Sequence, residues 1–158
     1  MSDHELTEAT PEDVRDLKTV DQMQKAPPVV CNFEGSPVEQ WRKMSIATGQ
    51  STKSMTELAG QTFGLVYWLA HQVKFRDRET QEYKSGVRTV IMDAAGNAYS
   101  SSSGVIYDDL CKLISILGPG PYDPPVPVTF RSQDRDNRRI YSLEAAPERY
   151  EAGERTPQ

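Results

Sequence analysis

The most constraining feature of this sequence is a long stretch in which apolar side chains alternate with other residues, from Thr62 to Arg76. A period of two residues predicts a β-strand, because successive side chains of a strand point to opposite faces. We expect one face of this strand, Phe63 through Phe75, to pack on a core, and Trp68, Lys74 and Arg76 to face outward. A strand of this length suits a small barrel whose two halves share it.

The rest of the chain predicts four further strands and one helix between them. Asp93–Asn97 has the composition of a hairpin turn, with Gly96 able to adopt a positive φ. A helix begins at Ser102 or Ser103, and Gly118-Pro119-Gly120-Pro121 ends it near Leu117. The four expected strands are Val87–Met92, Ala98–Ser101, Val126–Arg131 and Arg138–Ala145.

This order predicts a mainly β protein. Three strands, a helix and two more strands is the order of the OB-fold, a five-stranded Greek-key barrel with its helix between strands 3 and 4. Upstream, Ser36-Pro37-Val38-Glu39 predicts a helix to about Ala47, with Val38, Trp41 and Met44 on one face, and then a loop over residues 50–56. The expected organisation is an acidic flexible tail (1–28), a helix and loop lead-in (29–57), the OB-like barrel (58–146) and a flexible C-terminal tail (147–158).

The net charge of −5 resides in the two ends of the chain. Residues 1–25 carry seven acids and three bases, and residues 147–158 carry three acids and two bases, so the 121 residues between them are neutral in total. This balance excludes a basic protein of the histone type but leaves room for a polyanion partner on one face. Two cysteines, no signal peptide and apolar runs too short to cross a bilayer predict a cytoplasmic protein without a membrane partner.

Aromatic and basic residues recur along the predicted strands, whereas most acids of the barrel region fall in turns or on the helix. Proteins that bind single-stranded nucleic acid use aromatic rings to stack on bases and cationic side chains to contact the phosphates. The alternative interpretation makes the rings ordinary core residues and the arginines a solvated face. The candidate binding residues are Trp68, Lys74, Arg76, Arg78, Arg88, Tyr99, Arg131, Arg138, Arg139 and Tyr141.

Catalytic interpretations find little support. His4 and His71 cannot form a zinc or proton-relay pair, because one lies in a tail and the other on the expected core face of a strand. Cys31 and Cys111 lack metal-ligand spacing. The glycine-rich segment at Gly118 contains prolines, which remove the N–H donors that a phosphate loop needs. We therefore expect a non-enzymatic protein with no metal and no cofactor.

Several motifs of the chain together resemble small phage- or plasmid-borne single-stranded-DNA-binding proteins of the OB-fold type. The resemblance runs from about Gly60 to Ala146 and is carried by Gly60–Phe63, Tyr67-Trp68, Arg88–Tyr99, Ser103–Val105, Gly118–Tyr122 and Arg139–Leu143. It implies binding without sequence specificity during replication or recombination of a phage or mobile element, with no cofactor. Trp68, Tyr99, Tyr141 and the strand arginines would then line the binding groove. The partners implied are single-stranded DNA, with RNA left open, replication proteins and further copies of the chain.

One feature departs from that resemblance. Familiar members often end in an acidic tail with an aromatic tip that recruits partners, whereas Glu151–Gln158 is mixed in charge and lacks the tip. A second hypothesis therefore stays open, in which the same barrel is a protein-interaction or structural module, such as a phage assembly or host-modulating factor. Its contacts would come from the Trp41 helix and the acidic N-terminal segment.

Overall fold

A break at Val66 divides the long alternating stretch into two strands that belong to different sheets. The computed structural model describes residues 17–24, 29–77 and 79–146. Its elements are α2 (Val20–Gln24), β1 (Val29–Cys31), α3 (Pro37–Thr48), β2 (Lys53–Ser54), the 3-10 helix η1 (Met55–Leu58), β3 (Thr62–Leu65), β4 (Tyr67–Arg76), β5 (Tyr83–Met92), β6 (Ala98–Ser101), α4 (Gly104–Leu117), β7 (Val126–Arg135) and β8 (Arg138–Ala145).

The strands form two sheets that are not closed into a barrel. The larger sheet has the order β1-β4-β5-β6-β2, and the smaller has the order β3-β7-β8. Each pair is antiparallel except β2 with β6. The expected mainly β architecture with a helix between the third and fourth predicted strands is confirmed, but β6 and β8 pair with other strands and not with each other, so a closed five-stranded cylinder is not formed.

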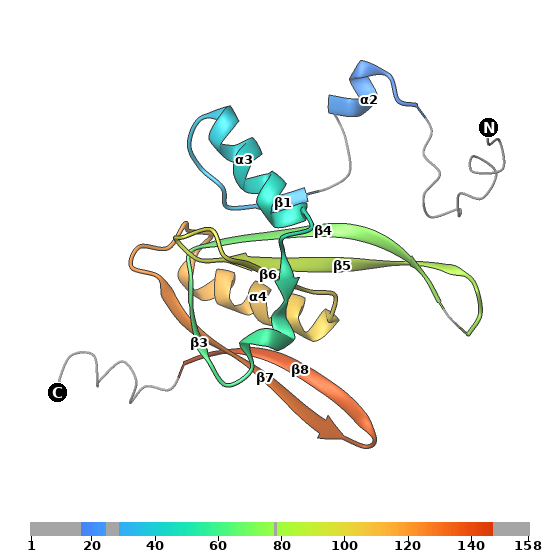
Figure 1. Ribbon diagram of the computed structural model, residues 1–158, viewed down its shortest axis with the longest axis vertical. Helices are drawn as coiled ribbons and strands as arrows, with labels where there is room; N and C mark the ends of the chain where they lie inside the picture. The colour runs from blue at the N-terminus through green and yellow to red at the C-terminus, as the bar shows by residue number, and fades with distance from the viewer. Residues whose placement is uncertain (1–16, 25–28, 78, 147–158) are drawn as a thin grey trace.

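Figure 1 shows α3 on one side of the larger sheet and α4 with the smaller sheet on the other. Each side holds its own hydrophobic core. On one face, Leu69, Val90 and Met92 pack with Phe33 and Ala47 beneath α3. On the other face, which we call the inner face, the larger sheet packs against α4 and the smaller sheet. This second core comprises Met55, Leu58, Phe63, Leu65, Trp68, Ile91, Ile106, Leu110, Tyr122, Val128, Phe130 and Leu143.

The local start and stop patterns of the sequence form the elements that they predict. Ser36 and Glu39 make the reciprocal capping box of α3, and Ser103 caps α4. Gly118 ends α4 with a φ of 81°, a conformation that favours glycine. In the hairpin between β5 and β6, the Asp93 carboxylate accepts hydrogen bonds from the backbone N–H groups of Ala95 and Asn97.

Residues 29–57 contribute more to the sheet than a helix and a loop. β1 pairs along one edge of the larger sheet with β4, and β2 pairs along the other edge with β6. Both strands have only two or three residues, too few to show an alternating pattern. On α3, the face that packs on the sheet includes Met44 and Ala47, whereas Val38 and Trp41 are 58% and 72% exposed.

Candidate nucleic-acid interface

Trp68 lies in the core and not on the surface. Its side chain is only 5% exposed, and its indole Nε1–H donates a hydrogen bond to the carbonyl of Pro119 at 2.9 Å. The prediction of an outward-facing ring is therefore wrong. It assumed one uninterrupted strand, but the break at Val66 shifts the alternation by one residue, so Leu65 and Trp68 enter the same core.

Asn32 holds the strand break in place. Its buried side-chain amide donates to the carbonyls of Val66 and Pro119, at 3.1 and 2.9 Å, and its Oδ1 accepts from the backbone N–H of Trp68 at 2.9 Å. Val66 itself still donates its backbone N–H to Met92 at 3.0 Å. One side chain thus satisfies the backbone groups that the break releases, which a buried irregular segment requires.

Arg88 is also placed away from the expected surface. It lies on the α3 side of the larger sheet, where its Nη1 donates to the carbonyl of Ala47 at 3.2 Å and lies 3.3 Å from His71 Nε2. Burial lowers the pKa of Arg88, and burial followed by the charge of Arg88 lowers the pKa of His71. The prediction that Arg88 shares a face with Lys74 is therefore wrong, since strand register places it opposite His71.

Lys74 and Arg76 continue the inner face along the hairpin of β4 and β5. Both lie an even number of residues from Trp68, so they share its side of the strand. Arg76 Nη2 donates to the Tyr83 hydroxyl at 2.8 Å, and the guanidinium carbon lies 5.1 Å from the centre of that ring. Its Nε is buried without a hydrogen-bond partner among the described residues. Arg78, another predicted contact, lies outside the described residues.

Where the loop of the β4–β5 hairpin begins, Lys84 forms an ion pair with Asp77. Its Nζ lies 2.8 Å from Asp77 Oδ2, and this contact, together with two backbone N–H donors, lowers the pKa of Asp77 to about 2. By contrast, no ion pair joins Lys74 or Arg76 to an acid within the part of the chain that the structure describes. These two cations are therefore available to an external anion.

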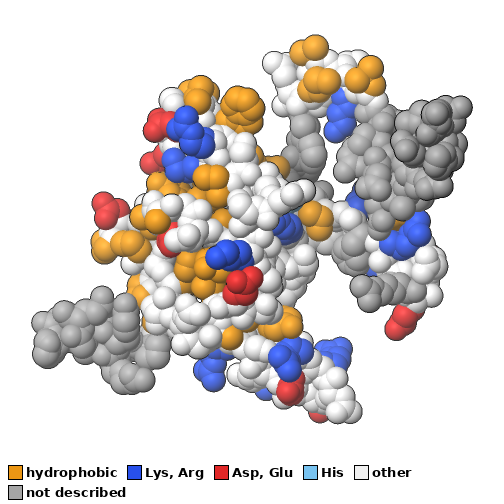
Figure 2. Space-filling view, viewed as in Figure 1, with side chains coloured by type: hydrophobic (Ala, Val, Ile, Leu, Met, Phe, Trp, Pro, Cys, Tyr) orange, Lys and Arg blue, Asp and Glu red, His pale blue; other side chains and the backbone are white. Residues whose placement is uncertain are grey.

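The second hairpin, β7 with β8, divides its predicted residues between its two faces. Tyr141 and Arg139 precede Leu143 at two-residue steps, so they lie on the side of the smaller sheet that faces the core, which we also call its inner face. Arg131 and Arg138 lie on the outer face. Arg139 Nε is 2.8 Å from Asp134, and Arg131 Nη1 is 3.4 Å from Glu144. These exposed ion pairs contribute little stability. Figure 2 shows cationic side chains on both hairpins.

The two predicted tyrosines are half-buried and pack on phenylalanines. The Tyr99 ring meets Phe63 edge-on at 5.4 Å and contributes to the inner core. The Tyr141 ring lies nearly parallel to Phe130, with centroids 5.5 Å apart and planes 27° apart. Tyr141 also lines an open cavity, so part of its ring remains accessible.

The cavity beside Tyr141 lies where the two sheets face each other without pairing, and we call it the seam cavity. It has a volume of about 490 Å³. Its lining residues come from β2 and the segment after it, from the end of β6 and the start of α4, and from the smaller sheet: Thr52, Lys53, Ser54, Met55, Thr56, Ser100, Ser101, Ser102, Ser103, Phe130 and Tyr141.

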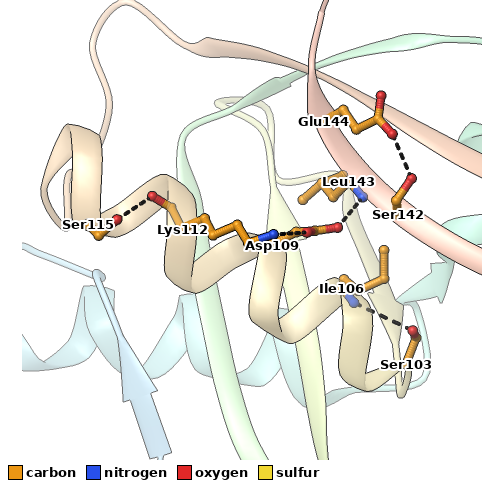
Figure 3. Close-up of polar contacts among 8 residues, drawn as sticks. All are labelled: Ser103, Ile106, Asp109, Lys112, Ser115, Ser142, Leu143 and Glu144. Atoms are coloured by element: carbon orange, nitrogen blue, oxygen red, sulfur yellow. Dashed lines mark hydrogen bonds and ion pairs between the residues drawn. The ribbon is translucent and has the colours of Figure 1, made fainter.

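Helix α4 begins at one wall of the seam cavity and is bonded to β8, the strand that carries Tyr141. Figure 3 shows the polar contacts of α4, including its bond to β8. At its first turn, the Ser103 hydroxyl accepts from the backbone N–H of Ile106 at 3.5 Å. One and a half turns along, Asp109 Oδ2 accepts from the backbone N–H of Leu143 at 2.9 Å, so the helix occupies a free donor of the edge strand β8. The position of Tyr141 on β8 is thereby tied to the helix that begins at the cavity.

Comparison of the chain with models of known protein families identifies its family. The family model for the phage single-stranded DNA-binding protein matches residues 24–145. The chain belongs to this family. The matched range includes β1 to β8, and therefore both hairpins and the seam cavity. No curated protein and no solved structure matches the chain.

Membership of the phage single-stranded-DNA-binding family confirms the resemblance noted in the sequence and gives single-stranded DNA as the partner. Within the described residues, no group of three or more metal-ligating side chains occurs, and none of the helices has the length and apolar character to cross a bilayer. The sequence prediction missed Tyr83 and Lys53 as candidate contacts. Tyr83 lies before the predicted start of its strand, and Lys53 lies in a segment that was expected to be a loop.

Proposed function

We propose that this chain binds single-stranded DNA without base specificity through the inner face of its two hairpins, as an OB-like protein acting in phage DNA replication or recombination in the host cytoplasm. The strand order and the helix between β6 and β7 support the OB-like assignment, although the sheets stay open. In OB-folds, the face of the second and third strands and two hairpin loops bind oligonucleotides. Here the corresponding loops are those of the β4–β5 and β7–β8 hairpins, whose ends extend beyond the core.

The observation that carries this proposal is the pair Lys74 and Arg76. Both cations lie on the inner face without an acidic partner among the described residues, and Arg76 has a buried donor left unpaired. A buried N–H without a partner costs free energy unless a ligand satisfies it. Phosphate oxygens of a DNA strand would do so, while Tyr83 and Tyr141 would contact bases. Arg139 would join after exchanging Asp134 for a phosphate.

The test is a titration of a fluorescent thymidine oligonucleotide with the full chain at several salt concentrations. Each phosphate contact releases a counterion, so the logarithm of affinity falls with the logarithm of salt by a slope of about 0.7 per contact on a single strand. Lys74→Ala combined with Arg76→Ala should reduce that slope by about 1.4. The matched control is Arg42→Ala, which removes an exposed arginine from α3 on the opposite side of the larger sheet. An equal reduction of the salt slope in Arg42→Ala, or an unchanged slope in the double variant, contradicts the proposed face. A titration with an RNA strand of the same length measures any preference for DNA.

The exposed face of α3 favours the second candidate function, a protein-interaction module. Trp41 is 72% exposed and Val38 is 58% exposed, one helical turn apart. An exposed tryptophan beside another apolar side chain is typical of a protein contact. A partner on α3 and DNA on the inner face would occupy opposite sides of the larger sheet, so the two functions are compatible.

A further inference from the structure

The seam cavity has a composition that restricts what it can bind. Its lining contains one cation, Lys53, several hydroxyl groups and no carboxylate. Its volume of about 490 Å³ falls in the usual range for small-molecule sites. One cation, hydroxyl donors and no carboxylate favour a ligand that accepts hydrogen bonds and carries negative charge.

An aromatic wall adds a flat apolar surface to this polar lining. The Tyr141 ring rests on Phe130 with planes 27° apart, so its position is fixed before any ligand arrives. Both rings line the cavity. A fixed ring with an accessible side is a stacking surface for another flat ring, and it loses little side-chain entropy on binding.

The cation and the hydroxyl groups lie on the neighbouring walls. Strand register places Lys53 beside Tyr99, and cross-strand neighbours share a face, so the Lys53 side chain lies on the inner face. Ser54 and Thr56 share a hydrogen bond between their hydroxyls at 2.8 Å, next to it. Within the described part of the chain, no ion pair joins Lys53 to an acid.

We propose that the seam cavity holds one nucleotide of the bound strand, with its base on Tyr141 and its phosphate at Lys53 and the adjacent hydroxyls. This inference rests on the proposed function and deepens it, because it places one nucleotide between the two sheets in addition to those along the hairpins. A base that enters the cavity has to leave a double helix first. The cavity therefore discriminates against double-stranded DNA.

The experiment uses the full chain and thymidine oligonucleotides in which one abasic site is moved along the strand. With the wild-type protein, one position should weaken binding by about 5- to 150-fold, the equivalent of one lost stacked base. Tyr141→Leu should remove this position dependence, and the matched variant Tyr141→Phe, which keeps the ring, should retain it. Lys53→Ala should lower the salt slope by about 0.7, whereas Lys112→Ala, an exposed lysine of α4 outside the cavity, should leave it unchanged.

The outcomes separate this inference from the proposed function. If the wild-type protein does not bind the intact oligonucleotide, both fail. If it binds with the expected salt dependence, but Tyr141→Leu and Lys53→Ala behave like the wild type, the seam subsite is overturned and the hairpin interface stands. Should Tyr141→Leu lose its fold, Lys53→Ala decides the question, because truncating an exposed side chain leaves the core intact.

Discussion

Asn32 shows how a single side chain determines which face of a strand is buried. Its amide bonds to Val66 and Trp68, on either side of the strand break, and to Pro119, about fifty residues further along the sequence. Without these bonds, the backbone N–H of Trp68 would be buried and unpaired, and the Val66 carbonyl would keep only the Tyr122 N–H as a donor. The position of Trp68 in the core, and with it the direction of Lys74 and Arg76, depends on this residue.

We predict that Asn32→Leu destabilises the protein by about 1–3 kcal/mol, because it leaves the buried N–H of Trp68 without an acceptor. The carbonyls of Val66 and Pro119 keep a second donor each, Tyr122 N–H and Trp68 Nε1–H. Chemical denaturation followed by circular dichroism measures the change. The control Asn97→Ala removes an exposed side-chain bond to Asp93 and should cost about 0.5 kcal/mol or less. Equal stability of the Asn32 variant and the wild type would show that the amide does not hold the break.

At the scale of elements, local patterns were predictable and long-range ones were not. The capping box of α3, the Asp93–Asn97 hairpin and the Gly118 helix end are specified within a few neighbouring residues, so their sequence patterns predict them. The break at Val66 depends on Asn32 and Pro119, which no local period reveals. The sequence therefore misplaced Trp68, which is in the core, and Arg88, which is on the α3 side. Lys74, Arg76, Arg139 and Tyr141 point toward the inner side, and their contact with DNA stays a prediction.

The anchoring of α4 on β8 gives a prediction at this scale. Asp109→Ala leaves the Leu143 N–H without its acceptor and should destabilise the fold by about 1.5–3 kcal/mol, the usual contribution of a hydrogen bond to a charged group. The neighbouring Asp108→Ala is the matched control, since that exposed carboxylate precedes the anchor by one residue and points elsewhere on the helix. Thermal unfolding compares the two. A loss as large in Asp108→Ala would mean that helix charge, and not the bond to β8, is responsible.

At the scale of the whole molecule, the larger sheet separates two surfaces. α3 covers one face, with its exposed Trp41, and the inner face carries the two hairpins and the seam cavity. The overall charge of −5 does not prevent DNA binding, because the net acidity belongs to the ends of the sequence, and Lys53, Lys74 and Arg76 point to the inner side of the larger sheet at two separate places. Because the two surfaces lie on opposite sides of the larger sheet, an experiment that reports on each side separately can locate the bound DNA.

Amide hydrogen exchange with and without a saturating oligonucleotide should show where the strand lies. We expect slower exchange in the hairpin of β4 and β5, in the hairpin of β7 and β8, and at residues 53–56 and 100–103, because bound DNA occludes these backbone groups. α3 should exchange at the same rate in both states, since it lies behind the sheet (Figure 1). The Lys74→Ala, Arg76→Ala variant, studied at a concentration that restores saturation, should lose protection mainly in the first hairpin.

If DNA protects α3 as strongly as the hairpins, Trp41 belongs to the DNA interface, and the division of the larger sheet into a protein-facing and a DNA-facing side is incorrect.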